Sequence, residues 1–406
     1  MEIISEFSRL ENENYHSYIW RMDELVQSGK YQNWKEITPM VNKELFNEDE
    51  SQYRDESAFR KAVKYARDFY EAGVFGNNED EYFNKLRIEK QELRKEKQKL
   101  FDERTGLNKL LREQSRREEL FNIVKRAIDE YEPIVFDYSP APIIDSDSDM
   151  IIHVTDVHCG VNIVSPFNTY NFDVLQERLK RYLDEIIEIR ETYNSQNAYI
   201  ILGGDMLHGL IHTNARIEAK ENIIEQIKKV SDVIGHFIDE LRYKFSNVFI
   251  YTTPGNHGRS MASKEEAIRG ENFDLLVPYV LSKDFKNVDN VFIKENTLDT
   301  NIATFNVRGW NVYASHGDKE NEKTVVYNMT KLARRARYPL PDMCYLGHRH
   351  TNGLSTVDEV KVIQSGCVDG MDSYAIDGRF VGSPEQTVTV VTQKKRVKAL
   401  CDIQLD

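Results

Sequence analysis

The sequence predicts a layered α/β domain with a largely buried sheet, preceded by a helical N-terminal region. From Met150 onward, short β-branched apolar runs alternate with amphipathic helical patterns. A stretch of prolines, serines and acidic residues before Met150 has no periodicity and is typical of a linker. The predicted parts are a small helical module at 1–80, a long helical, coiled-coil-like segment at 81–137, a linker at 138–149 and the α/β domain at 150–406.

Residues 1–80 are predicted to form a compact set of helices. Apolar side chains have helical spacing at 34–45 and again at 57–70, with a polar break between the two patterns. Basic residues in the second pattern lie largely off its apolar stripe, which is typical of a helix-turn-helix module that recognises DNA or a partner. The alternative is an ordinary helical bundle with a charged outer face. Residues 1–84 carry about eight more acidic than basic residues, which favours that alternative.

Residues 81–137 are predicted to be mainly one long helix. A leucine recurs every seven residues, but the positions between these leucines are mostly charged. The stripe consists of Leu86, Leu93, Leu100 and Leu107. It favours a helix that packs on its own protein over a homodimer, and a partner protein that binds within 1–137 is a further expectation. Basic residues exceed acidic ones by about six between Lys85 and Arg126, so this helix is a candidate for contact with a phosphate backbone or simply a solvated face.

Composition limits the classes of protein to which the chain can belong. Its 406 residues suffice for more than one domain, and its net charge of −13 repels polyanions except at a local basic patch or at bound metal ions. The four cysteines show no CxxC pair and no regular spacing, which is typical of reduced thiols. No secretory signal pattern and no run of about 20 apolar residues is found, so we expect a cytoplasmic protein without a membrane segment.

Seven apolar runs after the linker are predicted strands, and three longer amphipathic stretches are predicted helices. The strands are expected at 150–155, 198–204, 248–253, 310–315, 343–346, 360–364 and 386–392. The helices are expected at 173–193, 216–244 and 263–282. In sheets of this kind, ligands bind at the carboxyl ends of the strands.

Residues that can bind metal ions follow five of these strands, usually beside a glycine that allows a tight turn. Asp156 and His158 suit one ion, because residues i and i+2 of an extended chain point to the same side. Seven of the ten histidines lie in these five turns. One such histidine would more often be structural, but the set favours a metal centre. The candidates are Asp156, His158, Asp205, His208, Asn256, His257, His316, His348 and His350.

In chain order, Asp-x-His, Gly-Asp, Gly-Asn-His, His-Gly and Gly-His-x-His resemble the motifs of the calcineurin-like metallophosphoesterases over roughly residues 150–370. The resemblance implies a four-layer β-sandwich flanked by helices, with two metal ions at the strand ends. Mixed carboxylate, amide and imidazole ligands suit Mn²⁺ best, with Fe²⁺, Zn²⁺ and Mg²⁺ as alternatives. Carried over by position, the first metal would be held by Asp156, His158 and His350, the second by Asn256, His316 and His348, with Asp205 bridging.

The resemblance also implies a hydrolase, in which two ions clamp a phosphoryl oxygen and activate a bridging water. His257 would stabilise the transition state or protonate the leaving oxygen, the alternative being a structural hydrogen bond. His208, three residues after Asp205, resembles the Gly-Asp-x-x-His of DNA double-strand-break repair exonucleases, where it orients the DNA phosphate. Gly258 departs from the Asp or Glu usual in the family, which leaves the orientation of His257 open. Its neighbour Arg259 is the candidate phosphate-binding residue.

The expected function is therefore a two-metal DNA phosphodiesterase, a nuclease whose helical N-terminal region positions the polymer. The helical leader resembles phage-encoded phosphoesterases. A small-molecule phosphatase or cyclic-nucleotide phosphodiesterase is the first alternative and fits the acidic net charge better. A non-catalytic module that binds DNA or protein is the second alternative.

Overall fold

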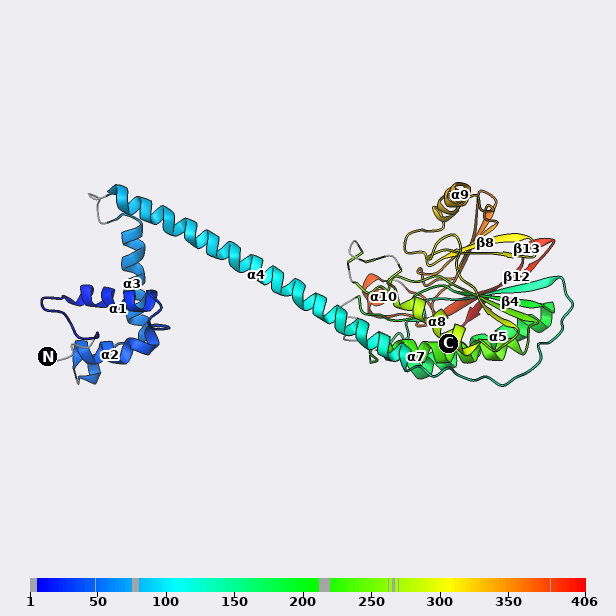
Figure 1. The fold of residues 1–406 in the computed structure, drawn as a ribbon, viewed down its shortest axis with the longest axis horizontal. Helices are drawn as coiled ribbons and strands as arrows, with labels where there is room; N and C mark the ends of the chain where they lie inside the picture. Colours follow the sequence, from blue (N-terminus) through cyan, green and yellow to red (C-terminus); the bar gives the residue numbers. More distant parts are fainter. Residues whose placement is uncertain are drawn as a thin grey trace. The chain divides into compact units, whose positions relative to one another are not determined.

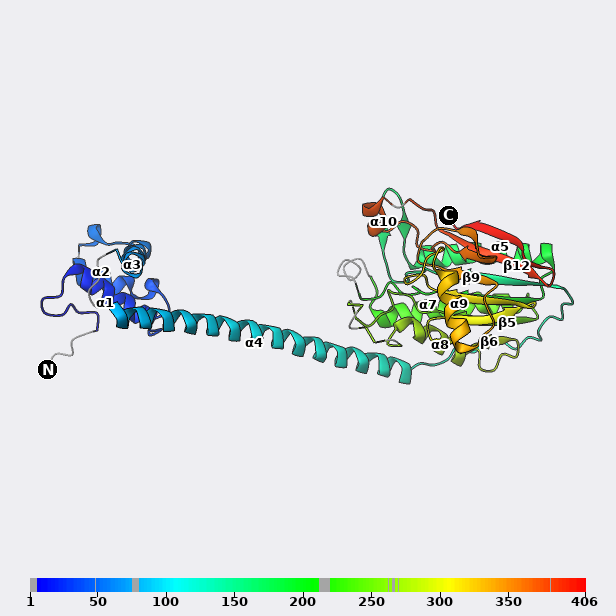
Figure 2. The same cartoon turned by 90° about the horizontal axis from the view of Figure 1, so that it is seen from above.

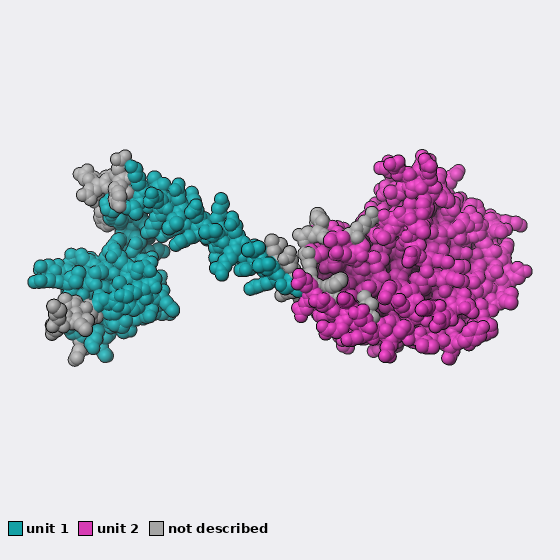
Figure 3. All heavy atoms as spheres, in the orientation of Figure 1, with its two compact units in different colours: residues 1–117 teal, residues 118–406 magenta. Residues whose placement is uncertain are grey.

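The structure is a computed structural model that describes residues 6–47, 49–74, 80–211, 220–261, 263–264, 267–268, 270–379 and 381–406. The chain forms two compact units, residues 1–117 and residues 118–406, and each is described by itself (Figure 3). The boundaries predicted at 80, 137 and 149 stay predictions. Among the described residues, no helix is both long enough and apolar enough to cross a membrane.

The first unit contains three short helices and the larger part of a long one. They are α1 (Tyr15–Gln27), α2 (Trp34–Phe46), α3 (Glu56–Glu71) and α4 (Asp80–Asp129). An Asn or Asp side chain caps the start of each short helix by accepting a backbone N–H. Trp34 stacks on Phe59 and donates to Asp23 Oδ1 (2.9 Å), so the three helices share one apolar core. Residues 47–55 connect α2 to α3, whereas a helix-turn-helix uses three or four residues, and that interpretation stays a prediction.

Along α4, every described side chain from Phe83 to Lys109 is exposed. Leu86, Leu93, Leu100 and Leu107 are 44%, 53%, 64% and 57% exposed. Nothing described in the first unit covers these leucines, and the prediction that the stripe packs on its own protein stays a prediction.

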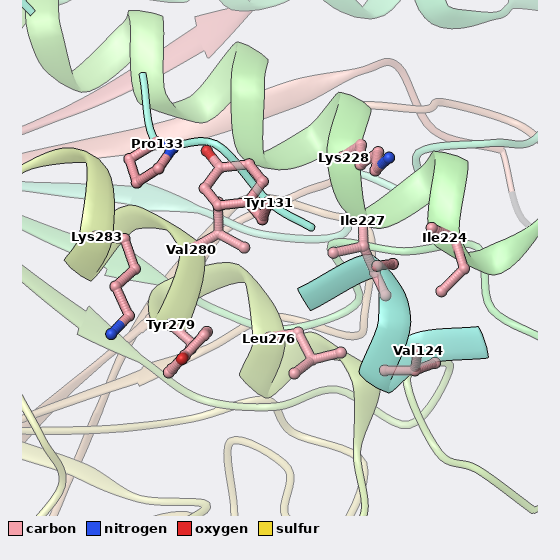
Figure 4. A pocket seen from close by; sticks show the side chains of 11 residues that line it. Val124, Tyr131, Pro133, Ile224, Ile227, Lys228, Leu276, Tyr279, Val280 and Lys283 are labelled. Atoms are coloured by element: carbon pink, nitrogen blue, oxygen red, sulfur yellow. The ribbon is translucent and has the colours of Figure 1, made fainter. Parts of the chain in front are cut away.

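The last turns of α4 belong to the second unit and pack there. Leu120 contacts the main core, and Tyr131, just beyond the helix, donates to Asp284 Oδ1 (2.7 Å). Between this end of α4 and two helices of the unit lies an apolar cavity of about 250 Å³ (Figure 4). None of the candidate metal ligands lines it.

Two mixed sheets form the centre of the second unit. The six-stranded sheet has the order β13-β12-β1-β4-β5-β6, and the five-stranded sheet has the order β10-β11-β9-β8-β7. The first contains β1 (Ser148–Val154), β4 (Asn197–Leu202), β5 (Asn247–Thr252), β6 (Val291–Ile293), β12 (Glu385–Thr392) and β13 (Lys395–Gln404). The second contains β7 (Ala303–Val307), β8 (Trp310–Ser315), β9 (Met343–Leu346), β10 (Gly353–Val357) and β11 (Val360–Gln364). A two-stranded ribbon is formed by β2 (Ile163–Val164) and β3 (Thr169–Tyr170).

Helices cover the outer faces of both sheets, which gives four layers (Figures 1 and 2). The six-stranded sheet buries its outer face against α5 (Phe172–Tyr193), α7 (Ile223–Arg242) and α8 (Leu276–Asp284). The five-stranded sheet packs against α9 (Val325–Ala336). A third apolar cluster, including Ile151, Ile201 and Tyr345, fills the space between the sheets. The short α10 (Ser373–Gly378) follows the last strand of the second sheet.

The predicted fold class is confirmed, and all seven predicted strands are present. One helix prediction is wrong: the described part of 263–272 is not helical, and α8 begins only at Leu276 after the 3₁₀ turn η2 (Phe273–Leu275). Gly270 has φ +95°, and Phe273 N–H donates to Gly258 O (2.7 Å), so the chain forms a loop here rather than a helical turn. Of the helix predicted at 216–244, residues 216–219 lie outside the described residues, residues 220–222 are not helical, and α7 covers Ile223–Arg242.

Candidate metal centre

The predicted ligands converge because the strands that carry them run in the same direction. In the six-stranded sheet β1, β4 and β5 are parallel neighbours, and in the five-stranded sheet β8 and β9 are. Their carboxyl ends therefore meet at one edge of the sandwich. Asp156 and His158 follow β1, Asp205 follows β4, Asn256 follows β5, His316 follows β8, and His348 and His350 follow β9.

The backbone at these positions is strained toward the site. Five of the predicted ligands have left-handed φ angles between 47° and 66°, a region that non-glycine residues rarely adopt. They are Asp156, His158, Asp205, His348 and His350. Gly255 is needed for a different reason, since a Cβ there would lie 2.1 Å from Asp205 Oδ1. Such strain persists only where the surrounding structure enforces it, and here it turns the side chains toward one another.

The first group of potential ligands consists of Asp156, His158 and His350. Asp156 Oδ1 faces His350 Nε2 at 3.2 Å and His158 Nε2 at 4.0 Å. Its other oxygen accepts from Thr155 Oγ1 (2.7 Å) and from the His348 backbone N–H (2.9 Å). The carboxylate is therefore fixed through Oδ2, and Oδ1 is presented to the two imidazoles.

The second group consists of Asp205, His316 and His348, with Asn256 beside them. His316 Nδ1 donates to the Gly203 carbonyl (2.9 Å), so this nitrogen carries a proton. Nε2 then faces Asp205 Oδ2 (3.0 Å) and Asn256 Oδ1 (3.3 Å). Asp205 also contacts the first group, because its carbonyl accepts from the His158 N–H (2.9 Å).

Burial and mutual charge set the ionisation of these groups. Burial opposes charge on Asp205, but His316 and His257 hold its pKa well below the usual range. Burial likewise opposes protonation of His316, yet Asp205 raises its pKa to about 10. Burial, together with the neighbouring His316, lowers the pKa of His348 to about 4. The Asp205 carboxylate is thus ionised at neutral pH, and positive charge beside it, on His316 or on a bound metal ion, stabilises it.

The donor set fits divalent cations. Both ring nitrogens of His158 and Oδ1 of Asp156 are buried without a hydrogen-bond partner among the described residues. Buried polar atoms without partners are costly unless an ion or water satisfies them. Carboxylate, amide and imidazole donors at this spacing suit metals of intermediate softness. The two clusters are consistent with a binuclear metal site, although the individual ligand roles stay predictions.

His208 and His257 lie against the first group, and together with His158 they form a third cluster of potential ligands. The His158 and His257 ring centroids are 4.6 Å apart. The His257 backbone N–H donates to Asp205 Oδ1 (2.7 Å), and its Nδ1 contacts the His208 carbonyl (3.0 Å). Arg259 donates through Nε to the Asn256 carbonyl (2.9 Å), so part of its guanidinium supports the loop; its role toward phosphate stays a prediction.

The space beside Gly258 is filled by other polar side chains. A Cβ at Gly258 would lie 2.1 Å from Asn272 Oδ1 and 3.0 Å from Asp274 Cγ. The Asp or Glu usual in the family therefore has no room here. His257 is oriented instead by its contacts with Asp205 and His208.

Asp274, which the sequence analysis does not single out, joins two of the ligand-bearing turns. Fully buried, it accepts through Oδ2 from the Asp205 N–H (2.9 Å) and the Gly255 N–H (2.8 Å). Burial and the charge of Asp205 raise its pKa to about 6. It follows no strand and belongs to no motif, so only the structure reveals it.

Asp369 is a second buried carboxylate that the sequence analysis does not single out. Its Oδ1 lies 3.8 Å from His350 Nδ1, on the opposite side of the ring from Asp156. Carboxylates in this position commonly orient a metal-binding imidazole. Burial raises its pKa to about 7.

A four-layer α/β sandwich with carboxylate, amide and imidazole donors gathered at one edge has the features of a metal-dependent hydrolase. The calcineurin-like phosphoesterase family matches residues 150–365, and the chain belongs to this family. The predicted family is thereby confirmed, and the chain is a metal-dependent phosphoesterase.

Several individual proteins are similar to the chain. The SPbeta prophage-derived uncharacterized protein YonJ of Bacillus subtilis (strain 168) is 24% identical over 357 residues, covering 84% of this chain and 85% of that protein. Because residues 150–406 make up less than two-thirds of the chain, this similarity extends into the N-terminal helices. Among solved structures, a novel archaeal phosphodiesterase is 14% identical, with 63% of this chain and 99% of that chain covered and a TM-score of 0.29. Vps29 of Entamoeba histolytica, complexed with Zn²⁺, is 10% identical, with coverage of 63% and 99% and a TM-score of 0.27.

Proposed function

We propose that this phosphoesterase is a DNA phosphodiesterase, a nuclease related to the double-strand-break repair exonucleases and encoded by a phage. The observation that carries the proposal is the cluster of His158, His208 and His257 beside the two ligand groups. The predicted metal ligands and His257 would suffice for hydrolysis, and His208 is an additional histidine. It stands at the position that orients the DNA phosphate in the repair exonucleases. Similarity to a prophage-derived protein supports the phage origin.

The metal ligands, His257 and Asp274 would have separate roles in the hydrolysis. When bound at the two ligand groups, the metal ions supply charge that stabilises a phosphoryl oxygen and lower the pKa of a water. His257 has its Nδ1 against the His208 carbonyl, so Nε2 is the atom that would deliver a proton to the leaving oxygen. Asp274 and Gly255 keep the turns after β4 and β5 in contact, which fixes the distance between Asp205 and Asn256.

Exposed cations on α4 support a polymeric substrate. Lysine and arginine side chains are exposed along the helix from Lys85 to Arg112, and a nucleic-acid backbone is the ligand that rows of cations bind most generally. The net charge of −13 favours the alternative, a small-molecule phosphatase or cyclic-nucleotide phosphodiesterase. A non-catalytic binding module is the third candidate.

One substrate panel distinguishes the three candidates. The purified chain with Mn²⁺ is offered linear double-stranded DNA, bis(p-nitrophenyl) phosphate, p-nitrophenyl phosphate and cyclic nucleotides, with Asp205→Asn as the inactive control. We expect turnover of DNA and of the synthetic diester. Turnover confined to the monoester or to cyclic nucleotides would support the small-molecule alternative, and Mn²⁺ binding without any turnover would support the binding module.

A truncation then tests whether the N-terminal helices position DNA. The cut belongs after Arg117, because the segment beyond it packs in the second unit through Leu120 and Tyr131. We expect residues 118–406 to lose activity on DNA while retaining it on the synthetic diester. Equal loss on both substrates would argue against a positioning role.

A further inference from the structure

The exposed leucine stripe of α4 has the features of a surface that binds a second helix. From Phe83 to Leu111 the stripe stays on one helix and within one unit, and its described apolar side chains are 44–64% exposed. Residues spaced by seven fall on nearly the same face of an α-helix, and a strict seven-residue repeat favours a left-handed supercoil with a partner helix. A helix this long gains little stability from propensity alone unless such a stripe is covered.

The heptad frame shows which partner fits. With the leucines at position d, position a holds Phe83, Lys90, Lys97, Arg104 and Leu111. Position g, one residue before each charged a position, holds Glu89, Glu96 and Glu103. In three successive heptads, a cation at position a, in the centre of the contact surface, is thus preceded by a glutamate at position g, at the edge of that surface.

This arrangement is complementary to itself in one orientation only. In a parallel, in-register pair, the cations at position a lie opposite one another, and each is flanked by the g glutamate of the other helix, which offsets their repulsion. Glu89 also faces Arg94 at position e of the next heptad. The long stems of Lys90 and Lys97 cover apolar surface while their charged ends reach the seam edge. In an antiparallel pair, g faces g, so the glutamates would repel one another.

We propose that α4 forms a parallel two-stranded coiled coil with α4 of a second copy of this chain, over residues 83–111. Because three a positions are charged, the contact between the two helices is not purely hydrophobic. Polar residues at position a are known to fix the register of a coiled coil and to limit it to two strands. The outward cations, including Lys85, Lys95 and Lys99, remain exposed in this pair. The proposal goes beyond the proposed phosphodiesterase activity and does not depend on it.

Cysteine cross-linking in the full-length chain tests the partner and its orientation. Leu86 lies at one end of the seam, so Leu86→Cys places the two sulfurs together only if the helices are parallel and in register. Ile88→Cys is the matched control, because Ile88 is 57% exposed on the same turn but faces outward at position f. We expect a disulfide-linked dimer from Leu86→Cys and little from Ile88→Cys. Equal cross-linking by both variants would overturn the proposal.

Charge exchange provides a second measurement that does not rely on added cysteines. Sedimentation equilibrium of the wild-type chain should show a monomer–dimer equilibrium. Replacing Glu89, Glu96 and Glu103 by lysine should raise the dissociation constant by about tenfold or more. Adding Lys90→Glu, Lys97→Glu and Arg104→Glu to that variant should restore the dimer. A monomer at all concentrations, an assembly larger than two, or no rescue by the second set of changes would each refute the parallel pair.

Discussion

The metal centre and the leucine stripe of α4 place their chemically important side chains in opposite environments. Asp156 and Asp205 are 0% and 1% exposed, their oxygens are held by backbone N–H groups, and their backbone is strained into place. Leu93 and Leu100 are 53% and 64% exposed, on a regular helix that no described part of the first unit covers. The first region is complete within one unit and needs only ions and substrate. The second is exposed and, in our proposal, is covered by a second copy of the chain, so changes in the two regions should affect different measurements.

The largest effect is expected at Asp205, whose carboxylate contacts His316 and the His257 backbone. Asp205→Asn keeps the shape of the side chain but removes its charge, so the balance that favours cation binding is lost. Because metal ions contribute several kcal/mol to stabilising phosphoryl-transfer charge, kcat on bis(p-nitrophenyl) phosphate should fall by about 10³-fold. Cross-linking through Leu86→Cys should be unchanged. Comparable activity in the variant would exclude Asp205 from the metal centre.

A smaller loss is expected at His257, and it should depend on the leaving group. If His257 protonates the leaving oxygen, His257→Gln should slow hydrolysis of DNA, whose leaving alkoxide is a poor leaving group, by about 10²-fold. The p-nitrophenolate leaving group needs little protonation, so the loss on the synthetic diester should be much smaller. Equal losses on both substrates would instead indicate that His257 supports the turn near Asp205.

Asp274 should affect the strength of metal binding more than the chemical step. Its Oδ2 accepts two backbone N–H groups of ligand-bearing turns, and an asparagine in its place would preserve volume but weaken both bonds. We expect Asp274→Asn to require about 10- to 100-fold more Mn²⁺ for half-maximal activity, with kcat largely restored at saturation. Asp284→Asn is the matched control, a buried carboxylate that bonds Tyr131 and Ile134 away from the site. If both variants respond alike, Asp274 acts only through general stability.

The sequence predicts the interior of the sandwich and misses its edges. The seven predicted strands are the seven interior strands of the two sheets, and the four missed ones (β6, β7, β10 and β13) are the four edge strands. Most interior strands are largely buried and read as apolar runs, whereas the edge strand β13 is interrupted by the exposed polar residues Lys395, Lys398, Asp402 and Gln404.

The same distinction applies to the site. Ligands such as Asp205 and His348 follow interior strands and stand beside glycines, so their convergence is predictable from the order of the strands. Asp274 and Asp369 act through contacts that only the folded chain creates, and no local pattern marks them. The exposure of Leu86 to Leu107 is likewise a property of the tertiary structure, because the same stripe would suit a helix covered by its own domain.

The smallest effect is expected in the first unit, where a peripheral ion pair rather than buried strain supports the fold. Glu13 accepts from Arg21 Nε (2.9 Å) and Nη2 (2.8 Å), and the Arg21 guanidinium lowers the pKa of Glu13 to about 2. The pair should therefore stabilise the helices fully above pH 4.5 and lose its contribution as the pH falls through about 2.

At pH 7, Glu13→Gln should speed amide exchange in α1 by about two- to fivefold, within the range of a well-aligned surface pair. Glu11→Gln, at an exposed neighbouring residue, should leave the exchange rate unchanged. The difference between Glu13→Gln and wild type should shrink as the pH is lowered toward 2, while activity on the synthetic diester at pH 7 stays equal. A change in that activity would mean that the first unit influences the metal centre, contrary to the separation of the two regions.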